Sequence, residues 1–161
     1  MEDGLLGLDN FALQTDESSL SGSIRLPFAL FRGDTTERAA LFLRGSLSDS
    51  DIYRFSGQSV TDLLGSSAGT RPFELDIDAE GNKDVIAIRR LNVERQGILK
   101  VDLRGKVTKV ANPPLRNGEI TLDALMQPAV SGIITRFAPG MKGQLSIPRN
   151  TRLKLNAGIK G

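Results

Sequence analysis

The sequence comes nearest to a metal-binding loop at residues 76–81, which read Asp-Ile-Asp-Ala-Glu-Gly. Acids at the first, third and fifth positions and a glycine at the sixth match the start of an EF-hand calcium loop. The twelfth position, which supplies a bidentate glutamate in that loop, is Ala87. A half-buried strand with one acidic, solvated face produces the same spacing. We therefore interpret residues 76–81 as strand and predict no metal site there.

Two aspartates, Asp49 and Asp51, could share a magnesium ion. They stand in the segment Ser-Asp-Ser-Asp, which is typical of a helix start, where a serine caps the first turn and acids favour the helix dipole. Capping accounts for both acids, so we predict no metal. Three glycine-spaced segments match no nucleotide-binding motif and are interpreted as turns: residues 4–7, 65–69 and 140–143. The sequence thus predicts no cofactor.

The residue inventory limits catalysis further. The chain contains no histidine, cysteine or tryptophan. Their absence excludes cysteine nucleophiles, histidine general bases, Ser-His-Asp triads, thiolate or imidazole zinc sites and c-type haem attachment. Carboxylates are frequent in the first half, but no spacing marks one pair as acid and base. We predict that the protein is not an enzyme. The alternative, a carboxylate- or metal-dependent enzyme, needs clustered acids in a cleft and a perturbed pKa.

Length and composition are those of one ordinary folded domain. The 161 residues are 39% hydrophobic and 25% charged, and a chain of this size folds without disulfide or metal. The longest strictly apolar run, residues 26–31, is about a third of the roughly 18 residues that a membrane span needs. The acidic start Met-Glu-Asp-Gly is unlike a signal peptide. We expect either a cytoplasmic protein or a piece of a longer one.

Charge is unevenly distributed along the chain. Residues 1–84 hold seven Lys/Arg and fifteen Asp/Glu, a net charge of −8, whereas residues 85–161 hold fourteen and four, a net charge of +10. Two interpretations fit: the halves attract each other, or the basic half meets an anionic partner such as lipid head groups. Nucleic acid is not predicted, because the chain has one tyrosine, seven phenylalanines mostly at strand-like positions and no recognisable binding motif.

Alternation of apolar and polar residues dominates the sequence and predicts roughly eight to ten short strands. In residues 72–80, for example, Phe73, Leu75 and Ile77 alternate with acids. A bulge or bend is expected at Arg89-Arg90, where the alternation changes parity. The expected strands cover residues 8–13, 20–30, 39–47, 72–80, 86–93, 99–107, 120–124, 145–147 and 153–159.

Two stretches break this alternation and predict short helices, at residues 48–64 and 127–137. Apolar residues there recur at helical spacing, and Pro128 suits a first turn. Each helix follows a strand and precedes a glycine-containing loop and another strand. This order predicts an internal repeat of about 80 residues, in which residues 73–81 correspond to 153–161. We interpret residues 1–161 as a single β-rich segment, an interior piece of a longer repetitive protein.

The predicted fold class is all-β with two short helices, and its apolar sheet face must be covered. An elongated, twisted, mostly antiparallel sheet could curl into an open groove that holds a ligand. Alternatively, the halves could close as a β-sandwich that serves as a structural or adhesive module. In the groove, acyl chains would gain about 0.8 kcal/mol per buried methylene. The candidate groove residues, for which plain core packing is the alternative role, are Ile24, Leu26, Phe28, Phe73, Leu75, Ile77, Leu99, Val101, Leu103, Leu153 and Leu155.

The order of these segments resembles the AsmA/TamB family of envelope proteins from double-membraned bacteria, and its TamB-type members in particular. The resemblance lies in recurring phrases of the form leucine-x-leucine-x-x-x-Gly and Gly-x-leucine-x-leucine-x-Gly-x-valine, and it spans about residues 8 to 161. It is a pattern and not a catalytic signature, so it assigns no residue a role. The phrases that carry it are at residues 18–26, 43–52, 73–82, 88–93, 97–110 and 118–124.

The resemblance implies a long open groove, apolar inside and polar outside, that reaches across the periplasm from an inner-membrane anchor. It implies transport of phospholipid between the inner and outer membranes and support of outer-membrane biogenesis. The partners implied are a phospholipid or another acyl-chain ligand, neighbouring repeats of the same chain, and an outer-membrane barrel assembly protein reached through other segments. The membrane anchor would lie in a segment absent from this sequence.

Overall fold

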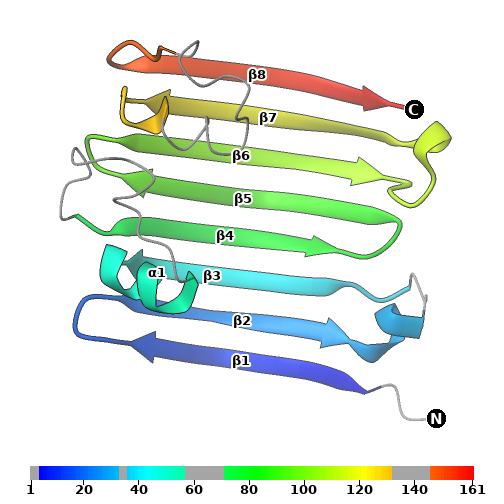
Figure 1. The fold of residues 1–161 in the computed structure, drawn as a ribbon. Helices are drawn as coiled ribbons and strands as arrows, with labels where there is room; N and C mark the ends of the chain where they lie inside the picture. The colour runs from blue at the N-terminus through cyan, green and yellow to red at the C-terminus, as the bar shows by residue number, and fades with distance from the viewer. Residues whose placement is uncertain (1–3, 33–35, 57–70, 132–145) are drawn as a thin grey trace.

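The computed structural model describes residues 4–32, 36–56, 71–131 and 146–161, whose eight strands form one open, curled sheet (Figure 1). Each strand is antiparallel to the next in sequence, which confirms the predicted fold class. The two-sheet sandwich is not formed by the described residues. The strands are β1 (Leu5–Gln14), β2 (Ser19–Pro27), β3 (Ala39–Leu47), β4 (Phe73–Gly81), β5 (Val85–Arg95), β6 (Leu99–Thr108), β7 (Asn117–Met126) and β8 (Thr151–Lys160).

The connections alternate between the two ends of the sheet, because spatial order equals sequence order. The β2–β3, β4–β5 and β6–β7 connections lie together at the right-hand end in Figure 1, with the short 3-10 helices η1 (Phe28–Arg32) and η3 (Pro113–Leu115). The other four connections lie at the left-hand end, where helix α1 (Asp49–Ser56) follows β3. Side chains in connections far apart in sequence therefore share one end.

Cross-strand register gives the sheet one apolar and one charged face. Leu43 pairs with Ile77, and Leu122 pairs with Leu155, while the next residue of each strand points to the other face. There Arg44 pairs with Asp76. Because the side-chain period is two, each such pair fixes the face of its whole strand. The alternation seen in the sequence thus becomes a separation of faces across eight strands.

Two bulges keep the apolar face continuous. The register between β1 and β2 shifts between Leu8 and Phe11, around Asn10 with its φ of 55°. The apolar positions of β1 therefore change from even to odd numbers without changing face. In β5 the pairing shifts around Arg89 and Arg90 against both neighbouring strands. The bulge expected at Arg89-Arg90 is thereby confirmed.

The buried core lies at the left-hand end. Ile98, Val130 and Ile147 contact one another with 4–8% of their surface exposed. This cluster joins the β5–β6 connection to the described ends of the β7–β8 connection, and Ile52 of α1 adds the β3–β4 connection. The partly buried side chains against it are Ile52, Phe73, Leu99, Met126 and Ala129.

The helix predicted at 48–64 is confirmed over Asp49–Ser56, whereas the described start of the helix predicted at 127–137 is mostly not helical: Gln127 has no regular structure, and Pro128 and Ala129 form a turn. The expected helix at 48–64 appears as α1, and residues 57–64 lie outside the described residues. Of the helix expected at 127–137, Val130 and Ser131 are helical, and residues from 132 onward lie outside the described part. The 80-residue repeat stays a prediction.

Two expected strands were wrong in extent. The strand expected at 20–30 ends at Pro27, and Phe28 begins η1. The pairing of β2 with β3 ends at Arg25, and the last bond on the β1 side runs from the Phe28 backbone N–H to the Gly4 carbonyl, at 2.8 Å. Of the strand expected at 145–147, Ser146 and Ile147 have no regular structure. Pro148, directly after them, cannot donate a ladder hydrogen bond.

Candidate functional site

The apolar face holds ten of the eleven candidate groove residues. Cross-strand pairing places them on one side of β2, β4, β6 and β8, together with the apolar positions of β1, β3, β5 and β7. Phe28 is the exception, because it lies in η1 beyond the end of β2. The residues on the face are Ile24, Leu26, Phe73, Leu75, Ile77, Leu99, Val101, Leu103, Leu153 and Leu155.

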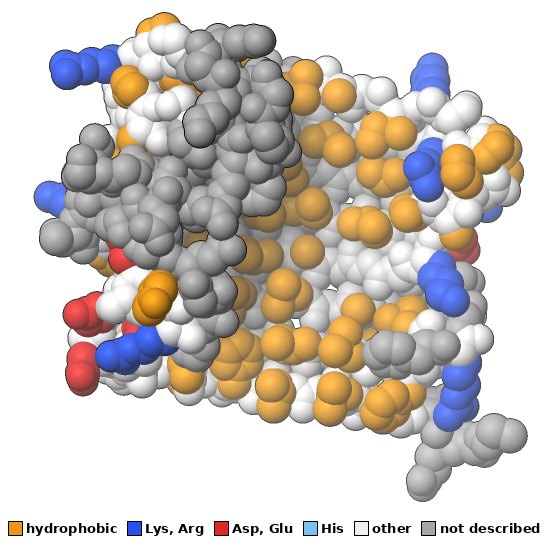
Figure 2. Space-filling view, viewed as in Figure 1, with side chains coloured by type: hydrophobic (Ala, Val, Ile, Leu, Met, Phe, Trp, Pro, Cys, Tyr) orange, Lys and Arg blue, Asp and Glu red, His pale blue; other side chains and the backbone are white. Residues whose placement is uncertain are grey.

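Much of this face is open, as the rows of apolar side chains in Figure 2 show. Leu6 and Leu8 of β1, Ile86 of β5 and Leu153 and Leu155 of β8 are each between 44% and 56% exposed. Among the described residues, the buried cluster at the left-hand end contacts strand ends such as Phe73 and Leu99. Isolated exposed leucines are ordinary on a protein surface, whereas a continuous exposed apolar face is unusual for a monomer.

The opposite face is charged and internally neutralised. Asp76 of β4 accepts from Arg90 at 2.8 Å and lies 3.6 Å from Arg44, and Arg89 binds both Asp78 and Glu80. The pairs of Arg89 and Arg90 join the basic second half of the chain to acids of the first half, as expected if the halves attract each other, whereas Arg44 and Asp76 both belong to the first half. These ion pairs also explain why residues 76–81 are strand and not a calcium loop. No group of acids in the described part of the chain is arranged to hold a metal ion.

Two carboxyl groups of the charged face have lowered pKa values. The hydrogen bond from Arg38 is the main cause for Glu80, and Arg89 adds to it. For Asp123 the main cause is the hydrogen bond from Arg152, with nitrogen–oxygen distances of 2.9 and 2.6 Å. Both acids are therefore held ionised, which suits ion pairing and not proton donation near neutral pH.

A hollow of about 570 Å³ lies on this charged face, opposite the predicted groove. Its charged walls are ion-paired: Arg152 with Asp123, and Arg104 with Asp102. Leu125, which is partly exposed, is the one apolar side chain among its lining residues. The lining residues are Lys100, Asp102, Arg104, Thr121, Asp123, Leu125 and Arg152.

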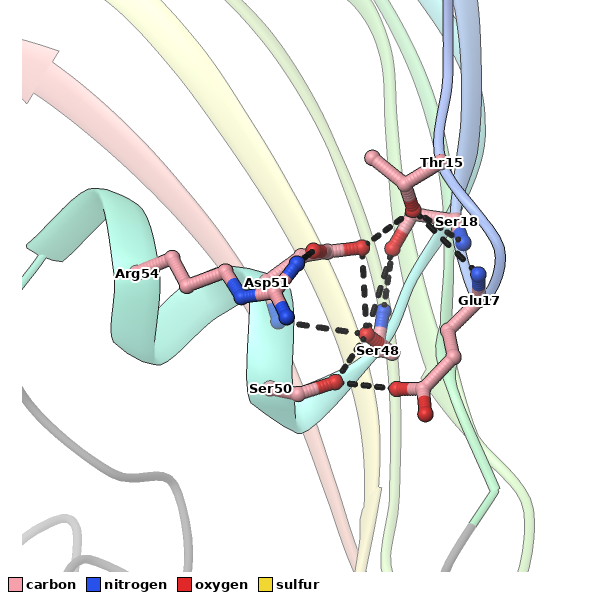
Figure 3. A network of polar contacts seen from close by, with 7 residues as sticks. All are labelled: Thr15, Glu17, Ser18, Ser48, Ser50, Asp51 and Arg54. Atoms are coloured by element: carbon pink, nitrogen blue, oxygen red, sulfur yellow. Dashed lines mark hydrogen bonds and ion pairs between the residues drawn. The ribbon is translucent and has the colours of Figure 1, made fainter.

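The two aspartates considered for magnesium have separate structural roles. Ser48 caps α1, because its Oγ accepts from the Asp51 backbone N–H at 3.2 Å (Figure 3). The Asp51 side chain is buried and accepts from the Thr15 hydroxyl at 2.5 Å. Hydrogen bonding from Ser18 is the largest cause of its lowered pKa, followed by Thr15. This network ties the β1–β2 turn to the start of α1.

Asp49 binds Arg95, a buried residue that the sequence analysis did not single out. Arg95 donates two hydrogen bonds to the Asp49 carboxylate, at 2.7 and 2.9 Å, and its guanidinium lies 4.8 Å from the centre of the Phe73 ring. Its side chain is fully buried, although its register with Leu99 places it on the apolar face. The pair fastens α1 to the sheet. The sequence did contain a sign of this pair: Arg95 occupies an apolar position of its strand, and a buried arginine requires a carboxylate partner.

No protein-family model, curated protein or solved structure matches this chain. Of the described helices, none has the length and apolar character needed to cross a bilayer.

Proposed function

We propose that the apolar face binds the acyl chains of phospholipid, and that the chain is a segment of an AsmA/TamB-like envelope protein. Its role is the transport of phospholipid between the inner and outer membranes, in support of outer-membrane biogenesis. The observation that carries the proposal is one open sheet whose apolar face runs across all eight strands and leaves large side chains exposed.

The size of the face suits this ligand. Seven strand spacings of about 4.8 Å and strands of about ten residues give a surface of roughly 34 by 33 Å. Half of that area, about 560 Å², is as large as the largest apolar patches of ordinary monomers, which measure about 300–600 Å². Each methylene that leaves water contributes about 0.8 kcal/mol. A lipid chain that lies on the face therefore removes apolar surface from water on both sides of the contact, its own methylenes and the exposed leucines beneath it.

The rest of the sheet suits a passive conduit. The charged face holds its arginines and carboxylates in ion pairs, which keep that face hydrated. Binding and release of acyl chains need no nucleophile, general base or metal, and the proposal is accordingly non-enzymatic. It places the chain in the periplasm, with neighbouring repeats extending the face.

The test is mass spectrometry of organic extracts of the purified chain, with a native spectrum in parallel. We expect stoichiometric phospholipid or fatty acid, lost in a Leu75→Asp/Leu103→Asp variant that places two charges on the apolar face. The matched control, Ser21→Asp/Thr121→Asp, adds the same charges on the opposite face and should keep its lipid.

Exposed Leu155 supplies a milder variant. Leu155→Asp alters the face at an edge strand where folding depends less on the side chain, and circular dichroism checks the fold of each variant. A folded wild-type chain without lipid would refute the proposal and favour a structural module. Equal lipid loss in the control pair would also count against it.

A further inference from the structure

The right-hand end of the sheet is positively charged. Five cationic side chains that we call the basic rim are all exposed there and form no ion pair within the described ranges of the chain. Arg32 ends η1, Lys83 lies in the β4–β5 turn, and the other three belong to the β6–β7 connection and the end of β8. The basic rim consists of Arg32, Lys83, Lys109, Arg116 and Lys160.

The rim is a built surface and not a set of loose loops. The Val110 and Ala111 backbone N–H groups donate to the carbonyls of Asp84 and Lys83, at 3.3 and 3.1 Å. The Gly161 N–H donates to the Arg116 carbonyl at 2.9 Å, and Arg116 Nε donates to the Val110 carbonyl at 2.9 Å. These bonds join the β4–β5 turn, the β6–β7 connection and the end of β8 into one ledge.

This end differs in charge from the rest of the molecule. Its described connections and the end of β8 hold the five rim cations against two acids, Glu37 and Asp84, a net side-chain charge of +3, because Arg38 is ion-paired with Glu80 of β4. At the left-hand end, acids such as Asp16 and Glu17 offset the cations. On the charged face the arginines are neutralised by carboxylates. Unneutralised positive charge is therefore concentrated where the strands end.

Exposed apolar side chains accompany these cations. Leu115 of η3 is 58% exposed, and Phe28 and Ile86 are each 44% exposed. In Figure 2, Lys/Arg and apolar side chains lie next to one another along the right-hand end, beside the open apolar face. Cations interleaved with exposed apolar side chains are typical of proteins that lie on a membrane interface. A soluble polyanion would use the cations alone.

We infer that the basic rim docks on the head groups of an anionic phospholipid bilayer. The rim cations contact phosphates, Phe28 and Leu115 enter the interface, and the strands run away from the membrane surface. In this orientation the apolar face begins where the acyl chains leave the bilayer. The inference rests on the proposed function, since it names the surface from which the acyl chains come.

The test is co-sedimentation of the full chain with phosphatidylcholine vesicles that contain about 30 mol% phosphatidylglycerol. Each cation near an anionic membrane surface raises the affinity of the protein for that membrane about fivefold. A Lys83→Gln/Lys109→Gln/Lys160→Gln variant should lower the partition coefficient by about 100-fold. The matched control, Arg71→Gln/Arg149→Gln/Lys154→Gln, removes the same charge elsewhere and should stay within about threefold of wild type. Leu115→Gln should weaken binding without a change of charge.

The inference would be overturned if the rim variant bound as tightly as wild type, if both triple variants lost binding equally, or if wild type bound equally to vesicles of phosphatidylcholine alone. Tighter binding to a single-stranded oligonucleotide than to the vesicles would also overturn it. If the wild-type extract contains lipid but the chain does not bind vesicles, membrane docking by the basic rim is refuted and lipid binding by the apolar face is not. If a lipid-free chain binds vesicles, membrane docking by the basic rim is supported and lipid binding by the apolar face is refuted.

Discussion

Replacing Asp49 with alanine should destabilise the fold far more than replacing Asp9. Both aspartates pair with an arginine, but the Arg95 side chain is fully buried and Asp49 is 26% exposed, whereas Arg25 and Asp9 are 60% and 59% exposed. Removal of one partner from a buried pair costs about 3–5 kcal/mol, because a charge stays in a low dielectric without compensation. An exposed pair contributes about 0–1 kcal/mol.

The cost of Asp49→Ala should lie near the lower limit, about 3 kcal/mol, because Asp49 keeps some contact with water and the Phe73 ring still faces the guanidinium. Urea unfolding of the full chain, followed by circular dichroism, measures both variants on one scale. The Asp49→Ala/Arg95→Met double variant removes the stranded charge. It should recover about 1–2 kcal/mol relative to Asp49→Ala alone.

Equal destabilisation by Asp49→Ala and Asp9→Ala, within about 0.5 kcal/mol, would refute this reasoning. So would a double variant that loses the sum of the two single effects. Either result would mean that the pair does not fasten α1 to the sheet.

Two further predictions concern Asp51 and Gly45. Since the folded-state pKa of Asp51 is lowered, its ionised form stabilises the fold above the unfolded pKa of about 3.9, and this contribution is lost as pH falls through the lower folded-state pKa. Melting temperatures of Asp51→Asn should therefore fall less than those of wild type between about pH 6 and pH 3; equal slopes would contradict the network's role. Gly45→Ala should cost more than about 1 kcal/mol in thermal melts, because Gly45 has a φ of 147° and an added Cβ would lie 1.9 Å from the Ser19 carbonyl oxygen. Gly158→Ala, with no atom within 4 Å of its Cβ, is the control and should stay within about 0.5 kcal/mol.

Alternation predicted the sheet well, because a strand with one apolar face has an apolar residue at every second position. Leu75, Val101 and Leu103 lie on the predicted face for this reason, and the parity change at Arg89-Arg90 predicted the bulge. The predicted end of β2 was wrong, since Phe28 and Leu30 continue the alternation although both belong to η1. Sequence parity does not report where a hydrogen-bond ladder stops.

Arg95 and the basic rim show what such patterns leave out. An arginine at an apolar position indicates a carboxylate partner, but Asp49 lies 46 residues away in sequence, and only the folded sheet brings the two together. The rim cations are scattered over the sequence and share no period. They come together because alternate connections of a meander share one end, so the signal was available once the strand order was known.

The strand order also governs how the molecule unfolds. Each strand is hydrogen-bonded only to the strands before and after it, so loss of β1 or β8 leaves the remaining ladder intact and opening can progress inward from either side. The cluster of Ile98, Val130 and Ile147, with Ile52 against it, opposes this fraying, because it joins connections that belong to different hairpins. The backbone hydrogen bonds of the basic rim join the β4–β5 turn, the β6–β7 connection and the end of β8 at the opposite end. Cooperativity in this sheet therefore resides in its connections and not in the strand ladder alone.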